Sequence, residues 1–563
     1  MSLTLIKRTG SPEPLTQALT DLDMTKILML IDPRMDEKKS IAFAETYFCG
    51  EAEELSLRFS VLSELKTLTD AAEMQEAIDL IRQIKKEQDS LRSAVTKLPM
   101  LLYRWRLMSA YVKAVRFWCD LLGTRSAEHP SERVADLRTF FRKHYESDLY
   151  ASCVQTLSEL NETLPLPRYI HVGMNLRDDG YPVDLGILSA EGHIDLMKEE
   201  DPASEPSLNA LLSSDDPAQP SLSLGPEFVY NRALYGSHFD EYIERSLEHE
   251  WRGKIAKAGK IAEKVKLEGL DEITALADDL QFYQVALLAA EAFESRGYAL
   301  CEPLPAENAS LDIKGALYPD FILHNEGIRG NDLLLQKGNA VIITGPNHSG
   351  KTSYLKTIGQ CYLLAQLGFF VPAESMVFEP VRHIFTLFSA GEDSSMTASR
   401  MGVEVKKLTE ILKKSTSRDL ILLNEPMTST NPVEAVSICA DLTRHFIEKG
   451  ITHLLVTHLY DIYFLLRAQL GAGELEKLES LITQSHYDES AGVMVHSYRL
   501  IKHDPLGNSY ARETAAAYGI TLPSMLSDEG MLAAAQQYCE THNIDSIYEG
   551  DDPHGISDNN GHR

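Results

Sequence analysis

The sequence predicts a multidomain chain in which an α-helical region with a small β excursion precedes an α/β domain. Three observations lead to this prediction. The first 165 residues are rich in Leu, Glu, Lys, Arg and Ala, with apolar residues three and four positions apart. Two β-rich runs within 168–190 flank a turn at Asp178-Asp179-Gly180. From about residue 310 onward, apolar strands alternate with helical segments, which predicts a mostly parallel sheet covered by helices.

Composition narrows the possible functions. The chain has 563 residues with 54 Lys and Arg against 83 Asp and Glu, a net charge of −29. This negative charge repels phosphate backbones and argues against tight, sequence-independent coating of nucleic acid. Its 7 cysteines are dispersed and form no C-x-x-C, so neither a disulfide framework nor a zinc knuckle is indicated. The amino terminus has no apolar leader and no run is long enough for a membrane span, so we expect a soluble, cytoplasmic protein without a membrane partner.

Changes in composition along the chain suggest its domain boundaries. We expect a helical core at 1–165, a β hairpin or small sheet at 166–198 and a flexible acidic Ser/Pro loop at 199–226. A second helical region follows at 227–305, then the α/β domain at 306–545 and a disordered tail at 546–563. The second helical region carries a cluster of basic residues, for which a solvated helix face is the simpler interpretation. This cluster comprises Arg252, Lys254, Lys257, Lys260, Lys264 and Lys266.

The strongest motif is GPNHSGKT at 345–352, which matches G-x-x-x-x-G-K-[ST] between an apolar strand and a helical segment. Glycines allow backbone N–H groups to surround a phosphate, and the helix amino terminus adds its positive dipole end. Lys351 would reach the β- and γ-phosphate oxygens, and Thr352 would offer a hydroxyl to Mg²⁺. We therefore predict binding of ATP and Mg²⁺ by Gly345, Pro346, Asn347, His348, Ser349, Gly350, Lys351 and Thr352.

Two later strands end in polar residues that suit hydrolysis. DLILLNEP (419–426) places Asn424 and Glu425 at a strand end, where Glu425 would be the general base. Metal binding is assigned to Thr352, Asn424 and Glu425, although Asn424 brings an amide oxygen without negative charge. The strand in ITHLLVTH (451–458) places His458 at the carboxyl edge of the sheet, within reach of a γ-phosphate. The catalytic set is thus Glu425, His458 and Lys351.

Ser399 precedes an amphipathic helical segment, where its hydroxyl could simply cap the helix or could contact an anion. A site enclosed by its own phosphate loop gains a last γ-phosphate contact most readily from another subunit. We therefore expect Ser399 to act across a dimer interface and to complete the nucleotide site of the partner.

Five segments together resemble the ATPase domain of MutS-type DNA mismatch-repair proteins: GPNHSGKT, FFVPAES (369–375), VEVKKLTEIL (403–412), LLNEPMTSTNP (422–432) and LLVTH (454–458). The closing HSYRLIKHDPLGNSYARETAAAYGI (496–520) does so as well. The resemblance covers about 310–545, and the preceding helices resemble the MutS core, lever and clamp more loosely. It implies a P-loop ATPase fold of the MutS/ABC type, a homodimer with composite ATP sites, dimerisation helices after Ser509 and movement of the helical arms around DNA.

The chain departs from the family pattern in three ways. Asn424 stands where the family has a metal-facing aspartate, which implies slower turnover. We expect no amino-terminal mismatch-recognition domain, because helical patterning begins almost at once. We also expect no carboxy-terminal nuclease-like domain of the MutS2 kind.

The leading hypothesis is therefore a dimeric ATP-driven switch that hydrolyses ATP to ADP and phosphate and binds DNA, by structure rather than by mismatch, in repair or recombination. The alternative is an ATP-holding interaction protein with slow hydrolysis that engages a protein or ribonucleoprotein, which the net charge favours. A third hypothesis is an ABC-type ATPase such as a chromosome-maintenance head. Such proteins use an L-S-G-G-Q loop across their dimer, and this chain has only SSMTASRMG within 391–402, which argues against this hypothesis.

Overall fold

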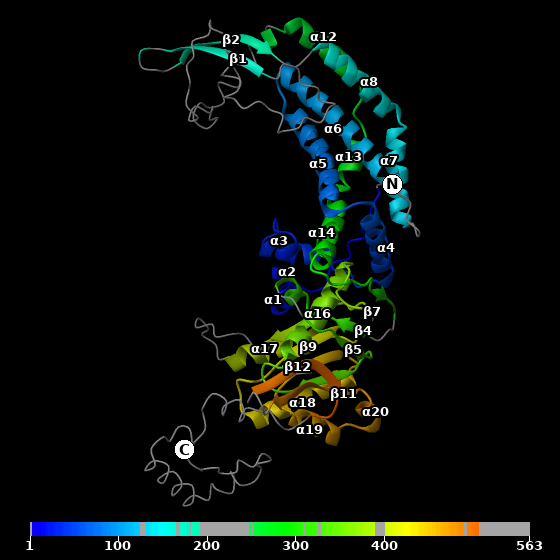
Figure 1. The fold of residues 1–563 in the computed structure, drawn as a ribbon, viewed down its shortest axis with the longest axis vertical. Helices are drawn as coiled ribbons and strands as arrows, with labels where there is room; N and C mark the ends of the chain where they lie inside the picture. Colours follow the sequence, from blue (N-terminus) through cyan, green and yellow to red (C-terminus); the bar gives the residue numbers. More distant parts are fainter. Residues whose placement is uncertain are drawn as a thin grey trace, which may run out of the picture.

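The protein is an elongated, curved molecule with the α/β domain at one end of a helical arm (Figure 1). The helical region followed by an α/β domain, predicted from the sequence, is confirmed. Among the described residues, no helix combines the length and apolar character needed to cross a membrane. The computed structural model describes residues 3–123, 131–164, 169–176, 178, 182–191, 247–249, 251–307, 311–324, 328–388, 400–488 and 493–505.

The arm is built from helices, most of them long, that pack lengthwise on one another. In chain order they are α4 (Ala52–Leu68), α5 (Ala71–Ser93), α6 (Lys97–Gly123), α7 (Glu132–Tyr145), α8 (Asp148–Thr163), α12 (Arg252–Ala262), α13 (Leu270–Thr274) and α14 (Ala277–Glu294). Side-chain caps mark the starts of two of them: the Asp70 carboxylate accepts from the backbone N–H of Glu73 in α5, and the Ser147 hydroxyl accepts from that of Tyr150 in α8. At the far end of the arm, β1 (Tyr169–Leu176) and β2 (Pro182–Glu191) form an antiparallel pair (Figure 1).

A six-stranded sheet forms the centre of the α/β domain. Its order is β12-β11-β6-β10-β9-β8, and all neighbours are parallel except β11 and β12. The strands are β6 (Ala340–Thr344), β8 (Ile384–Phe388), β9 (Leu420–Asn424), β10 (Thr452–Val456), β11 (Leu478–Asp488) and β12 (Val493–Lys502). The sequence analysis predicted five of these strands but missed β11. Because β12 runs antiparallel to β11, the sheet is mixed at that edge.

Both faces of this sheet are covered by helices. Along β6, Val341 and Ile343 join the core that contains α16 (Lys351–Leu367), whereas Ala340 and Ile342 join the core on the opposite face. That second core contains residues of α17 (Arg400–Lys414), α18 (Pro432–Glu448) and α19 (Asp461–Gln469). Burial on both faces explains why these strands are continuous apolar runs. The short α20 (Ala472–Leu475) precedes β11.

A smaller sheet, not predicted from the sequence, lies beside α16. Its order is β3-β7-β4-β5, and α15 lies between β4 and β5 in the chain. The elements are β3 (Leu304–Pro305), β4 (Leu311–Ala316), α15 (Pro319–His324), β5 (Asn331–Leu335) and β7 (Ser375–Phe378). The β5 strand contacts β12, so the two sheets meet beside the start of α16.

The amino-terminal helices α1 (Thr16–Asp21), α2 (Met24–Ile31) and α3 (Glu37–Tyr47) lie between the arm and the α/β domain (Figure 1). Their contact with α16 is close and polar: Gln360 Nε2 donates to the Leu22 carbonyl at 2.7 Å, and Lys356 pairs with Asp23. A Cβ on Gly359 would fall 2.6 Å from Leu22 Cδ2, so a larger residue there would force the buried Leu22 side chain to shift. The first residues of the chain thus help to hold α16 in place.

Candidate functional site

The loop between β6 and α16 has a backbone that most side chains would not permit. Gly345, His348 and Gly350 have φ values of 146°, 59° and 91°. A Cβ on Gly345 would lie 1.9 Å from Thr483 Oγ1, so glycine is required there. The Thr483 hydroxyl donates to Ser349 Oγ at 2.7 Å, and Ser349 Oγ in turn donates to the Pro346 carbonyl at 2.7 Å. The loop is therefore held in a curled conformation, the kind that forms anion-binding concavities.

Lys351, the first residue of α16, is only 5% exposed. Its Nζ donates to the Gly345 carbonyl at 2.9 Å and to the Pro346 carbonyl at 2.7 Å. Burial lowers the pKa of this ammonium to about 8, although the nearby Glu425 carboxylate opposes the shift. A buried cation at the amino terminus of a helix strongly favours binding of an anion at that place.

Three side chains with oxygen atoms that could bind a magnesium ion lie beside the loop. The Thr352 hydroxyl donates to Asn424 Oδ1 at 2.9 Å, and Asn424 ends the buried strand β9. Glu425 follows directly and is half-buried. Magnesium prefers oxygen ligands and keeps several waters, so a hydroxyl, an amide oxygen and one carboxylate fit it, with less negative charge than a carboxylate pair would supply. In the described part of the chain no group of three or more His, Cys, Asp or Glu could hold a metal.

Glu425 and His458 form a direct pair at the same sheet edge. His458 Nε2 lies 2.8 Å from Glu425 Oε1, and the Glu425 backbone N–H donates to the Val456 carbonyl of β10 at 2.8 Å. The hydrogen bond from His458 lowers the pKa of Glu425, and the charge of Lys351 adds to this effect. Glu425 is therefore held as a carboxylate. Its φ of 50° is in the left-handed region, an arrangement that concentrates at functional sites.

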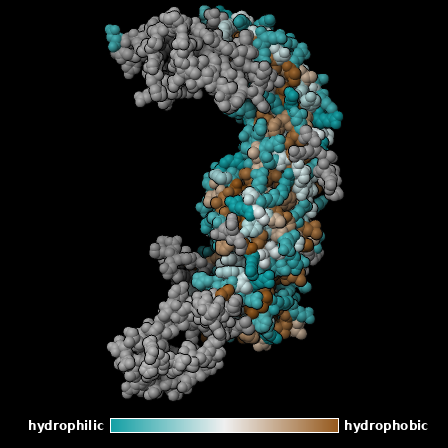
Figure 2. Space-filling model, viewed as in Figure 1, coloured by the Kyte–Doolittle hydropathy of each residue, from teal (hydrophilic) through white to brown (hydrophobic). Residues whose placement is uncertain are grey.

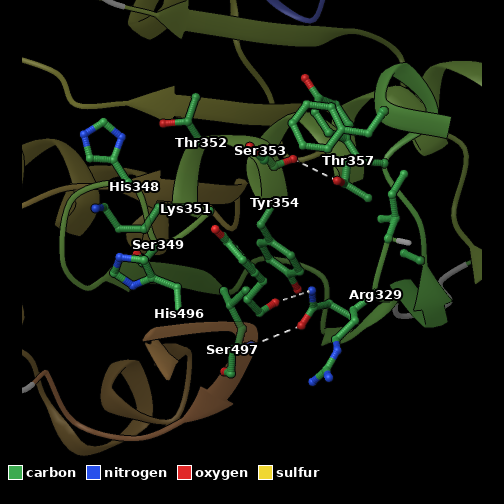
Figure 3. A pocket seen from close by; sticks show the side chains of 18 of the residues that line it. Arg329, His348, Ser349, Lys351, Thr352, Ser353, Tyr354, Thr357, His496 and Ser497 are labelled. Atoms are coloured by element: carbon green, nitrogen blue, oxygen red, sulfur yellow. Dashed lines mark hydrogen bonds between the residues drawn. The ribbon is translucent and has the colours of Figure 1, made fainter. Parts of the chain in front are cut away.

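These residues border a cavity of about 1210 Å³ (Figure 3). One wall consists of residues predicted from the sequence, namely Asn347, His348, Ser349, Gly350, Lys351, Thr352 and Glu425. The other described residues of the predicted site do not line the cavity but contact residues that do. The carbonyls of Gly345 and Pro346 accept from Lys351. Asn424 accepts from Thr352, and His458 pairs with Glu425. The structure thus brings together all of the predicted site residues that it describes. Ser399 and the segment after Ser509 lie outside the described residues.

Sequence reasoning missed the opposite wall. It comes from Tyr318, Phe321 of α15, Ile328 and Arg329 before β5, and β12. In the view of Figure 3, Arg329 lies away from the phosphate loop, while Lys351 lies between His348 and His496 of β12. The Asn331 side chain joins the two elements of this wall.

Asn331 bonds to β12 in both directions, because its Nδ2 donates to the Tyr498 carbonyl at 3.0 Å and its Oδ1 accepts from the Leu500 N–H at 3.1 Å. A further bond orients His496, whose Nδ1 lies 2.8 Å from Ser485 Oγ. The only sequence signal for this wall was the strand VMVHSYRLI, and nothing in it indicates that β5 lies alongside.

A largely parallel α/β sheet with a glycine loop and a buried lysine at its carboxyl edge defines a class of phosphate-binding architecture. Within it, residues 341–525 match the family model of MutS domain V. This part of the chain is therefore related to MutS proteins.

Known relatives support this assignment. The DNA mismatch repair protein MutS of Thermotoga petrophila is 31% identical over 180 residues, which is 32% of this chain and 23% of that protein. MutS of Chlorobium limicola is 30% identical over 263 residues, 45% of this chain and 29% of that protein. The human MutS protein homolog 4 is 28% identical over 262 residues, 45% of this chain and 28% of that protein. The matched part of the chain therefore spans less than a third of each relative's length.

The close approach at Gly345 gives a first prediction. Gly345→Ala should lower the free energy of unfolding by about 1–3 kcal/mol, because it adds a clash and a strained φ. Thr483→Ala should reduce this cost when combined with it, since the nearest clashing atom is the Thr483 hydroxyl. Chemical denaturation of both single variants and the double variant measures the coupling. Gly473→Ala is the matched control, because a Cβ there would meet nothing within 4 Å. Strictly additive effects of the two substitutions would contradict the packing described.

Proposed function

We propose that this protein is an ATPase that binds Mg·ATP in the cavity and hydrolyses it to ADP and phosphate. The observation that carries the proposal is the convergence of three units on one sheet edge: the curled loop with buried Lys351, the Thr352–Asn424 pair and the Glu425–His458 pair. The MutS relatives favour the same chemistry. The base and ribose would occupy the part of the cavity lined by Phe321 and Arg329, which leaves the loop to the phosphates.

Each residue has a role that follows from its contacts. The loop N–H groups and Lys351 bind the phosphates and offset the charge that develops during transfer. Thr352 and Asn424 would hold Mg²⁺, which neutralises phosphate charge when bound. Glu425, kept ionised by His458, orients the attacking water in line with the γ-phosphate. His458 positions Glu425 and can donate to the γ-phosphate.

We further propose that the protein works as a homodimer whose ATP state moves the helical arm. Apolar side chains are exposed at the amino-terminal ends of α17 and α18: Met401 at 38%, Val405 at 42% and Val433 at 78%. These helices flank the loop that follows β9, so a second copy that covered them would also approach the nucleotide. Ser399, one residue before α17 in the chain, is proposed to complete the partner's site.

DNA recognised by its structure, in a repair or recombination setting, is the proposed partner of the arm. The basic cluster on and after α12 is exposed at every position, at the far end of the arm from the ATP site (Figure 1). Hydrophilic side chains cover much of this part of the surface (Figure 2). With a net charge of −29 over the whole chain, phosphate contacts would have to concentrate on such a local cluster.

The alternative, an ATP-holding interaction protein with slow hydrolysis, is favoured by one specific contact. Asn424 Oδ1 already accepts the Thr352 hydroxyl at 2.9 Å and brings no charge to a metal. Such a site can close on nucleotide and turn it over slowly while a protein or ribonucleoprotein is bound. The next experiment separates the two functions.

Asn424→Asp should raise the steady-state rate of ATP hydrolysis about tenfold and lower the Mg²⁺ concentration needed, because a carboxylate binds the metal more tightly. Glu425→Gln should lower the rate by about 10²-fold or more while ATP binding persists, since it removes the charge that orients water. Phosphate release over a magnesium titration measures both. A gain far above tenfold for Asn424→Asp supports the ATP-holding function. An unchanged rate indicates that the natural site is already competent, and full activity of Glu425→Gln contradicts the assigned mechanism.

Lys254→Glu combined with Lys257→Glu should weaken binding of branched or duplex DNA and make it less sensitive to salt, because fewer counterions are released. Filter binding at two salt concentrations, with and without a nonhydrolysable ATP analogue, measures this. Lys85→Glu with Lys86→Glu is the matched control, with the same charge change on exposed positions of α5. Equal loss in both double variants, or no loss in the first, would rule out a specific role for the basic cluster.

A further inference from the structure

The turn after β9 is strained and must be held by its surroundings. Glu425 and Met427 have φ values of 50° and 63°, a region that L residues seldom adopt, and Pro426 lies between them. The turn thus departs from the strand sharply and aims the Glu425 carboxylate at His458. Strain of this kind persists only where neighbouring groups fix the backbone.

Glu404, on α17, supplies that fixation. Its Oε1 accepts from the Met427 backbone N–H at 2.7 Å, and its Oε2 lies 3.3 Å from the Ser429 hydroxyl. Both oxygens of one carboxylate therefore bind the same turn. Charge-assisted bonds of this kind are stronger than neutral ones. Met427 is itself buried, which anchors the other side of the turn in the core.

The position of α17 therefore sets the conformation of the turn. The carboxyl-terminal half of α17 is anchored by Leu408 and Ile411 in the core beside the sheet. Its amino-terminal half exposes Met401 and Val405, and Glu404 lies between these two in the sequence. Glu404 belongs to this half of the helix and binds the turn directly, so a shift in the position of this half would be passed to Glu425.

We propose that Glu404 is a positioning residue that aligns Glu425 for hydrolysis and makes the hydrolytic step depend on the placement of α17. The proposal rests on the ATPase function argued above and adds a separate element to it. Binding of ATP is not affected, because the bonds of Lys351, Thr352 and Ser349 do not involve α17. Among the described residues, those that line the cavity include none from α17.

The test compares substitutions on α17 in the full chain. Glu404→Ala should lower kcat for ATP hydrolysis by about 10- to 100-fold, with little change in KM or in the dissociation constant for a nonhydrolysable ATP analogue. Glu404→Gln should restore most of kcat, because its amide oxygen can still accept from Met427 N–H. Glu410→Ala is the matched control on an exposed position of the same helix and should leave kcat unchanged. Ser429→Ala, which removes the weaker contact, should give a smaller decrease in kcat than Glu404→Ala.

The outcomes separate this inference from the function it rests on. Wild-type protein that binds no ATP would refute the ATPase function. If wild-type protein hydrolyses ATP and Glu404→Ala keeps its kcat, only the role of Glu404 is refuted. Equal loss in Glu404→Ala and Glu404→Gln would also refute it, because the hydrogen bond would then not be the cause. If Glu404→Ala does not fold, Ser429→Ala decides: a lowered kcat with unchanged ATP affinity supports the inference, and an unchanged kcat overturns it.

Discussion

The Lys351 ammonium is buried at the first turn of α16, and the rest of the site is arranged around this charge. Its partners are the carbonyl oxygens of Gly345 and Pro346, which solvate the cation without neutralising it. The energetic cost appears as a pKa lowered to about 8. A bound phosphate group would offset that cost. The burial that disfavours the charged lysine in the free protein therefore favours binding of an anion. The loop conformation fixed by Thr483 and Ser349 is what keeps the ammonium there.

Helix α16 connects this charge to the helical arm. It begins at Lys351 and ends at Leu367, whose carbonyl accepts from the fully buried Arg58 of α4 at 3.3 Å. Arg58 also pairs with the buried Glu54, and breaking such a buried pair costs about 3–5 kcal/mol. Gln366 adds a bond from its Nε2 to the Cys49 carbonyl at 2.9 Å. Any movement of α16 would therefore be transmitted directly to the base of the arm.

Much of the site was predictable from the sequence, because the determining residues are close together in the chain. The octet 345–352 directly follows a strand and contains its own glycines and helix start. The apolar strands that lead to Asn424 and His458 place these residues at the sheet edge. The parallel order then brings them together without further information. The helical region was predictable for the same reason, since amphipathic periodicity is local.

The rest depends on contacts between distant segments, which have no local signal. The wall opposite the loop depends on the bond from Asn331 to Tyr498 of β12, 167 residues later in the chain. In the small sheet, β4 pairs with β7, and the phosphate loop and α16 lie between these two strands in the sequence. Strand β11 was missed because its sequence, LESLITQSHYD, mixes polar residues with a few apolar ones at the edge of the parallel block. The hydrogen bond that the Met427 N–H donates to Glu404 also joins residues whose contact no sequence pattern predicts.

Hydrogen–deuterium exchange with and without a Mg²⁺-bound nonhydrolysable ATP analogue tests the central claim most directly. If the loop binds the triphosphate, amides of 345–354 and of the facing wall at 495–500 exchange more slowly with the analogue, and Lys351→Ala loses this protection. Exchange at 345–354 that is unchanged at saturating analogue, or protected equally in Lys351→Ala, would contradict the account.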